Sequence, residues 1–193
     1  MTEQQEVFIS PSDLIGHSPV ISYAGGKSNI TQFLIDRFPA HELYIDLFCG
    51  GLSVTLAKPR NMSDAEWIND KYNAVANFFT VLRDMPVEFT RFFRDGFIID
   101  AEVLYRMWAE RLKVEVEIPD VEQAVIFWMT QLQTYTGRNA AASTSYKYQM
   151  GRYRGRHYTD LPYDRIEATH DRLAGVQIFC RDFRHIIKMA SRY

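Results

Sequence analysis

The sequence has few of the features that mark membrane, disulfide-stapled or metal-binding proteins. Only two of its 193 residues are cysteines, and they do not form a Cys-x-x-Cys pair. No apolar run approaches the roughly 18 residues of a membrane-spanning helix, and the polar, acidic residues 1–6 do not resemble a secretory signal. The five histidines are scattered without ligand spacing. These absences predict a cytoplasmic globular protein with reduced thiols, no membrane contact and no metal.

The common glycine signatures of nucleotide-binding proteins are absent too. The sequence has neither the G-x-G-x-x-G pattern nor the full phosphate-loop pattern G-x-x-x-x-G-K-[ST], and both absences argue against most nucleotide-using enzymes. It has instead, over residues 44–70, an apolar strand-like run, a turn at Cys49-Gly50-Gly51, a helix-forming run and a second apolar run that ends at Asn69-Asp70. A carboxylate about 20 residues past a glycine turn can bind ribose hydroxyls. A lone Gly-Gly pair can equally be only a tight turn.

A second glycine turn lies upstream, at residues 22–27, and ends in Lys27. The periodicity of the next residues predicts a helix over 28–38 with Ser28 as its cap. A glycine turn that leads into a helix N-terminus suits a carboxylate or phosphate ligand. The alternative is that Lys27 is an ordinary solvated lysine.

Helical periodicity continues after Asp70. It predicts helices at residues 72–83, 87–93, 101–113 and 121–133, a helical block with Trp108 and Trp128 in its core. A further helix at 160–173 and a strand at 175–180 follow. Asp182 comes directly after this strand and can cap a last helix.

Charge is distributed unevenly along the chain, although the net charge is only −2. Residues 1–136 contain 11 Lys and Arg against 19 Asp and Glu, whereas residues 137–193 contain 11 against 5. Residues 137–158 have no acidic residue, and tyrosines alternate with their basic residues. Such a segment can neutralise phosphates and stack on bases, so it predicts a hairpin-like arm that binds double-stranded DNA. The alternative is a solvated loop.

Four short segments, taken in order, resemble the Dam-like family of DNA adenine-N6 methyltransferases. They are Tyr-Ala-Gly-Gly-Lys at 23–27, Phe-Pro at 38–39, Asp-Leu-Phe-Cys-Gly-Gly-Leu-Ser at 46–53 and Ile-Asn-Asp at 68–70. The arm adds Tyr148-Gln149-Met150-Gly151-Arg152-Tyr153, which is similar to the family's recognition hairpin except for a missing proline.

The resemblance implies a set of functional residues. The two glycine turns would line a pocket for S-adenosylmethionine, the Asp of the Asn-Asp pair would hold its ribose, and the Asp-Phe pair after the last strand would contact its adenine. The residues implied for the cofactor are Tyr23, Ala24, Gly25, Gly26, Lys27, Asp46, Phe48, Gly50, Gly51, Asp70, Asp182 and Phe183. The residues predicted to bind DNA come from the basic, tyrosine-containing arm, which this resemblance supports, and are Arg138, Lys147, Tyr148, Arg152, Arg154 and Arg156.

The family's Asp-Pro-Pro-Tyr motif, which holds the target amino group, is absent. Asp160-Leu161-Pro162-Tyr163 lacks the double proline and precedes the last strand, so we interpret it as a helix start. We therefore expect an N-terminal portion of a methyltransferase, inactive by itself, that pairs with a complementary C-terminal fragment or self-associates. The alternative is a degenerate module that only binds cofactor or DNA. Restriction-modification and phage settings both stay open.

The expected fold is α/β, with a partial Rossmann-like methyltransferase sheet and a mostly helical DNA-recognition subdomain. Residues 1–70 and 160–193 would form the incomplete cofactor-binding core. Residues 71–159 would form the target-recognition subdomain, with the basic arm at 137–158.

Overall fold

A small parallel sheet lies at the centre of the computed structural model, which describes residues 19–21, 23, 25–94, 102–133 and 163–193. Its strands are hydrogen-bonded in the order β1–β2–β3, with bounds Leu43–Asp46, Ala65–Asn69 and Gln177–Phe179. The described helices are α2 (Thr31–Ile35), α3 (Ser53–Ala57), α4 (Asn73–Asp84), α5 (Pro86–Arg94), α6 (Glu102–Arg111), α7 (Val121–Gln133), α8 (Tyr163–Leu173) and α9 (Phe183–Ala190). Two short 3-10 helices are also present, η1 (Ser28–Ile30) and η2 (Arg60–Met62). The fold is therefore mixed α/β.

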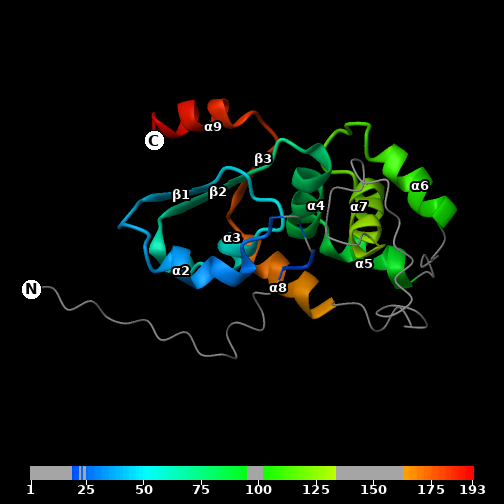
Figure 1. The fold of residues 1–193 in the computed structure, drawn as a ribbon, viewed down its shortest axis with the longest axis horizontal. Coiled ribbons are helices and arrows are strands. Elements are labelled where there is room, and N and C mark those ends of the chain that lie inside the picture. The colour runs from blue at the N-terminus through cyan, green and yellow to red at the C-terminus, as the bar shows by residue number, and fades with distance from the viewer. Residues whose placement is uncertain (1–18, 22, 24, 95–101, 134–162) are drawn as a thin grey trace, which may run out of the picture.

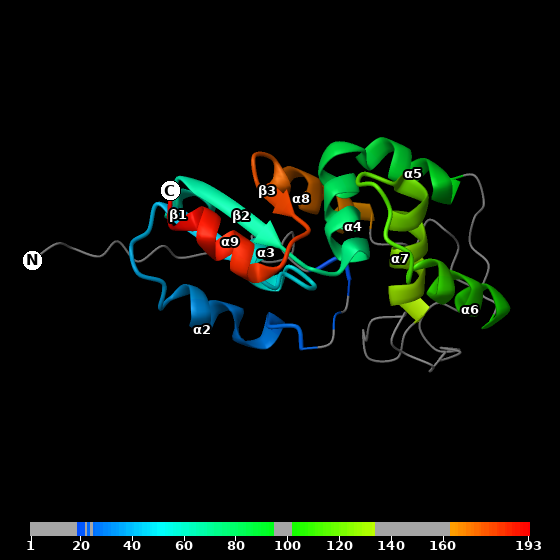
Figure 2. The ribbon, with the colours of Figure 1, turned by 90° about the horizontal axis from the view of Figure 1, so that it is seen from above.

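Helices cover both faces of the sheet, with α9 on one side and α2, α3 and α8 on the other (Figures 1 and 2). Neighbouring side chains of β2 therefore contact different helices, because successive strand residues point to opposite faces of the sheet. Glu66 bonds Arg172 of α8, whereas the neighbouring Trp67 packs against Tyr193 beyond α9. Strands buried on both faces are typical of parallel sheets.

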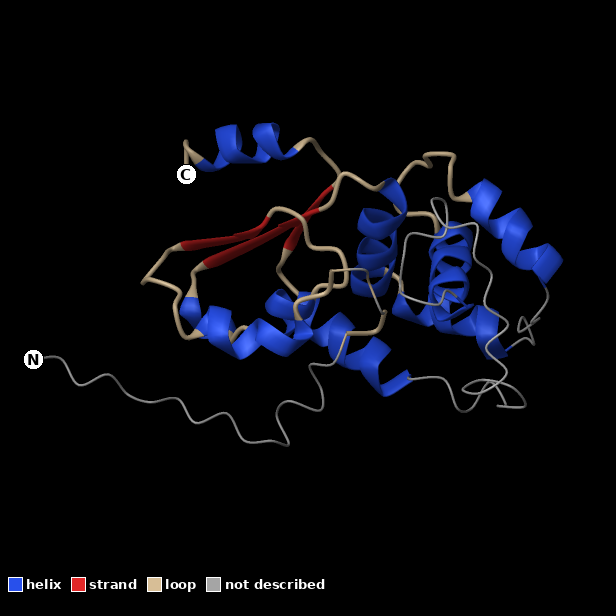
Figure 3. Ribbon diagram, in the orientation of Figure 1, coloured by secondary structure: helices blue, strands red, loops and turns tan. Residues whose placement is uncertain are grey.

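The helical block stands beside the sheet and is joined to it by α4, as the blue helices in Figure 3 show. α4 packs on β3 and α8 as well as on α5 and α7. Phe78, Phe79 and Phe127 are fully buried in one aromatic cluster. Trp108 and Trp128 are buried as predicted. One continuous apolar core thus runs from the sheet into the block, and the division into subdomains at residue 70 stays a prediction.

Most predicted elements are present, with bounds that differ by a few residues at most ends. The helix predicted at 121–133 has those bounds, and the strand predicted at 175–180 spans 177–179. The expected cap at Ser28 is wrong: Lys27 precedes the first turn, and the Ser28 hydroxyl instead bonds the Ser53 hydroxyl at 3.0 Å. A side chain that ties two turns together is not free to cap its own helix.

The predicted basic arm, with all six residues implied for DNA, lies outside the described residues, as do residues 160–162. Within the described ranges, no helix is long and apolar enough to cross a membrane. The same ranges contain no group of three or more His, Cys, Asp or Glu side chains arranged to hold a metal ion.

Candidate functional site: a cavity at the strand ends

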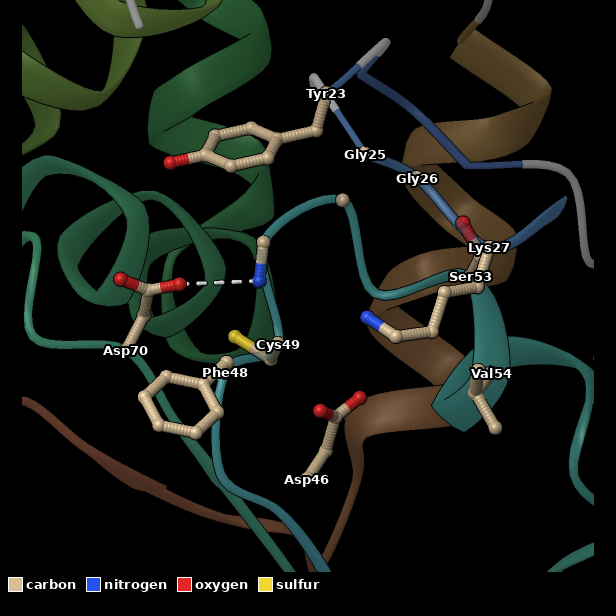
Figure 4. A pocket seen from close by; sticks show the side chains of 12 residues that line it. Tyr23, Gly25, Gly26, Lys27, Asp46, Phe48, Cys49, Ser53, Val54 and Asp70 are labelled. Carbon is tan, nitrogen blue, oxygen red and sulfur yellow. Dashed lines mark hydrogen bonds between the residues drawn. The ribbon is translucent and has the colours of Figure 1, made fainter. Parts of the chain in front are cut away.

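A cavity of about 230 Å³ lies where β1 and β2 end (Figure 4). Parallel strands bring the loops after their carboxyl ends to one edge, which is where open α/β sheets bind ligands. Both glycine turns border this cavity. Its lining residues are Tyr23, Gly25, Gly26, Lys27, Asp46, Phe48, Cys49, Gly50, Gly51, Ser53, Val54 and Asp70.

The first glycine turn presents Lys27 to the cavity. Gly25 has a φ of +77°, and the Gly26 amide donates to the Tyr23 carbonyl at 2.9 Å, which closes the turn. The bond between Ser28 and Ser53 ties the start of η1 to α3. Figure 4 shows the Lys27 ammonium and the Asp46 carboxylate directed into the same space.

The second glycine turn is shaped by the ring of Tyr23. A Cβ on Gly50 would lie 2.9 Å from Tyr23 Cδ1, and one on Gly51 would lie 3.1 Å from Tyr23 Cβ, so the ring can pack closely only on glycine. Leu52 follows with a φ of +64° and a fully buried side chain. A left-handed non-glycine residue costs about 1–2 kcal/mol, so the surrounding core must hold this turn in place.

Asp70 is fixed against the second turn. Its Oδ2 accepts from the Gly50 amide at 3.1 Å, and its Oδ1 accepts from the Tyr72 amide at 2.9 Å. Burial raises the pKa of this carboxyl, and the two amide bonds oppose the rise without cancelling it. The carboxylate is thus held in one orientation at the wall of the cavity.

Asp46 is the last residue of β1, and a hydrogen bond from Thr55 orients its carboxylate. Thr55 Oγ1 donates to Asp46 Oδ2 at 3.1 Å, and the Tyr44 hydroxyl lies 3.4 Å from Thr55 Oγ1. Burial raises the pKa of Asp46, while the Thr55 bond and the charge of Lys27 lower it less. Burial, with the negative fields of Asp70 and Cys49, raises the pKa of Tyr23 to about 12, so its phenol stays neutral.

The end of β3 adds a second aromatic ring beside the cavity. The rings of Phe48 and Phe183 have centroids 5.5 Å apart, and Phe48 is 61% exposed. Asp182 is not among the lining residues. It caps α9 by accepting from the Arg184 amide at 3.0 Å, which confirms the predicted cap.

The structure thus brings together most residues implied for the cofactor. Nine of them line one cavity, Phe183 contacts one of these nine, Asp182 caps the adjacent helix, and Ala24 lies outside the described residues. The prediction missed Cys49, Ser53 and Val54 as lining residues. Their positions inside or just after the second glycine turn could have indicated them.

A comparison with known protein families identifies the class. The D12 class N6 adenine-specific DNA methyltransferase family matches residues 23–193. The match begins at the tyrosine of the first glycine turn and covers every described element. The chain belongs to this family, as the order of its sequence motifs predicted.

Proposed function

We propose that this chain supplies the S-adenosylmethionine site and a DNA-recognition segment of a DNA adenine-N6 methyltransferase. Membership of the family suggests adenine-N6 methylation of DNA. The observation that carries the cofactor proposal is the convergence of Lys27, Asp46, Asp70 and two glycine turns on one cavity at the strand ends. The sheet would then be the partial Rossmann-like core, and residues 71–159 the target-recognition subdomain.

The side chains around the cavity suit the chemical groups of this cofactor. Asp70 keeps acceptor capacity on both oxygens beyond its two amide bonds, which suits a pair of ribose hydroxyls. The exposed face of Phe48 suits a purine ring. Lys27 can pair with the ligand's carboxylate and Asp46 with its ammonium group. When bound, the cofactor supplies an electrophilic methyl group on a sulfonium centre.

Electrostatics favour a ligand that carries positive charge. Asp46 and Asp70 are both half-buried, and partial burial raises the pKa of both. A nearby cation favours the ionised form of a carboxyl group. A cationic ligand would therefore lower the free-energy cost of holding two ionised carboxylates in the wall of one cavity.

Methyl transfer requires a second set of groups that accept from the target amino group. The sequence contains no Asp-Pro-Pro-Tyr motif to do so. Proximity alone leaves the amino lone pair unoriented. We therefore propose that the 193-residue chain binds cofactor but does not methylate DNA alone. Among the described strands β1 and β3 each pair on one side only, and a strand from a complementary fragment, or from a second copy, can add at a free edge.

The test begins with calorimetric titration of S-adenosylmethionine into the purified chain. Asp70→Ala should weaken binding by about 1–3 kcal/mol, because it removes a buried hydrogen-bonding carboxylate. Asp84→Ala is the matched control, since Asp84 pairs with its neighbour Arg83 at the end of α4, outside the cavity lining. Unchanged affinity in a folded Asp70→Ala protein would refute the assignment of Asp70.

Transfer of a labelled methyl group to duplex DNA then separates the alternatives. The chain alone should show no transfer, and an added fragment with the missing motif should restore it. Turnover by the chain alone would locate catalytic residues within it and refute the proposed inactivity. Binding without activity in either arrangement would favour the degenerate binding module.

A further inference from the structure

The regular strand pairing ends among the residues that border the cavity. The register of β1 with β2 ends at Asp46 opposite Ile68, and that of β2 with β3 ends at Asn69 opposite Phe179. Beyond these pairs two main-chain bonds remain, from the Asp70 amide to the Phe179 carbonyl at 3.2 Å and from the Cys49 amide to the Asn69 carbonyl at 3.0 Å. Neither bond reaches Leu47 or Arg181, where the other two strands lead into their loops.

The side chain of Asn69 continues the connection past this point. Its Nδ2 donates to the Leu47 carbonyl at 3.1 Å and to the Arg181 carbonyl at 3.0 Å, and its Oδ1 accepts from the Arg181 amide at 3.0 Å. The residue is 1% exposed, and its backbone carbonyl also accepts from the Cys49 amide at 3.0 Å. Only a carboxamide of this length can donate twice and accept once here.

Each residue in this arrangement immediately precedes a group at the cavity. Leu47 precedes Phe48 and Asn69 precedes Asp70, both of which line the cavity, and Arg181 lies two residues before Phe183, whose ring contacts that of Phe48. The Phe48 and Phe183 rings, 5.5 Å apart, follow β1 and β3, two strands that are not neighbours and are joined in the sheet through β2. A shift of either strand end would change the spacing between the rings and the Asp70 carboxylate.

We propose that Asn69 is a positioning residue: its carboxamide sets the spacing of the three strand ends that bind the nucleoside part of the cofactor. This inference rests on the proposed function of the cavity. Asn69 does not line the cavity itself, so it acts through Leu47 and Arg181. In metal sites, removal of a residue that orients a ligating side chain commonly lowers metal affinity about 10–100-fold. We expect removal of the Asn69 carboxamide to lower the affinity for the cofactor in the same way.

The chain contains a matched control in Asn77 of α4. This asparagine is also fully buried and also bonds one backbone residue twice, donating to the Asp120 carbonyl at 2.7 Å and accepting from the Asp120 amide at 2.7 Å. It joins α4 to the start of α7 and has no link to a strand end. Loss of either carboxamide should lower stability to a similar degree, but only loss of Asn69 should disturb the cavity.

The experiment compares Asn69→Ala, the space-filling Asn69→Leu and Asn77→Ala by thermal unfolding and by calorimetric titration where each protein is folded. All three should melt at lower temperature. Both Asn69 variants should bind S-adenosylmethionine at least about tenfold more weakly, and Asn77→Ala should bind like the wild type. 5′-Methylthioadenosine, which lacks the amino-acid part, should lose affinity by the same factor.

Other results overturn the inference. Wild-type affinity in folded Asn69 variants would refute it, as would a loss for S-adenosylmethionine that methylthioadenosine does not share. A wild-type chain that binds neither compound would refute the proposed function, and the inference with it. If the Asn69 variants do not fold, exchange of side-chain amide protons in the wild type decides: ligand should slow exchange at Asn69 and not at Asn77, and equal behaviour would refute the inference.

Discussion

Replacement of Glu66 by glutamine should remove the charge at the centre of a buried ion cluster. Glu66 Oε1 lies 2.9 Å from Lys58 Nζ, and its two oxygens accept from Arg172 at 2.6 and 2.8 Å. The three side chains are at most 9% exposed. The cluster joins the end of α3, strand β2 and helix α8, so it fixes the helices on one face of the sheet.

The size of the effect follows from the charges that would remain. Glu66→Gln leaves two cations facing each other without a counter-ion, and breaking a buried pair costs about 3–5 kcal/mol. For a chain of this length that loss lowers the melting temperature by about 6–20 °C. Arg172→Met should cost less, because Glu66 then keeps Lys58 as a partner and the remaining pair is neutral.

The same cluster predicts a pH dependence. Burial raises the pKa of Glu66, but Arg172 and Lys58 together outweigh burial and hold the pKa below its usual value of 4.5. A carboxyl with a lowered folded-state pKa stabilises the fold above its unfolded pKa and loses that contribution as pH falls. Stability should therefore decline below about pH 4.5 in the wild type, and this part of the decline should be missing in Glu66→Gln.

Urea unfolding at neutral and acidic pH, followed by circular dichroism, measures both effects. A suitable control is Glu110→Gln, because Glu110 and Lys113 form an exposed pair of a kind worth about 0–1 kcal/mol. If Glu66→Gln were no more destabilising than this control, or if Arg172→Met were the more harmful change, the reasoning about unpaired buried charge would be refuted.

Two further predictions concern binding. In the wild type the Thr55 hydroxyl donates to Asp46 and lowers the pKa of that carboxyl, so Thr55→Val should raise the Asp46 pKa. As pH is lowered, the affinity of the variant for S-adenosylmethionine should therefore begin to fall at a higher pH than that of the wild type. Coincident pH profiles would contradict this role of Thr55. Joint replacement of Arg152, Arg154 and Arg156 by alanine should reduce the salt dependence of DNA binding by up to about one unit of slope for each phosphate that the arm no longer neutralises. An unchanged slope in filter-binding or fluorescence titrations would favour a solvated loop.

Local pattern was enough to predict the strand, turn and helix over residues 44–57. A run of apolar residues followed by two glycines can form few other structures, and the structure has β1, the turn and α3 in that order. The proximity of Asp70 to Gly50 was also predictable, since a parallel strand that follows a short crossover pairs beside the first strand. The bond of 3.1 Å between them fits that expectation.

Long-range partners were not predictable. Asn69 bonds Arg181, and Glu66 bonds Arg172, across more than 100 residues of sequence. Nothing near Asn69 indicates that its carboxamide, and not only the neighbouring carboxylate, matters at the strand end. The left-handed backbone conformation of Leu52 was equally unpredictable, because it depends on the packing of the side chain in the core and not on the intrinsic backbone preference of leucine.

Glu66 is buried and Asp46 and Asp70 are half-buried, and these three carboxylates differ in how their charge is balanced. Glu66 has two cationic partners, and its pKa lies below the usual range. Asp46 and Asp70 form no ion pair with any described residue, and burial raises their pKa. Burial of a carboxylate without a counter-ion lowers stability unless a ligand supplies the charge, and such groups concentrate at functional sites. The contrast therefore supports a cavity that holds a cationic ligand, whereas the charges of the Glu66 cluster are balanced among themselves.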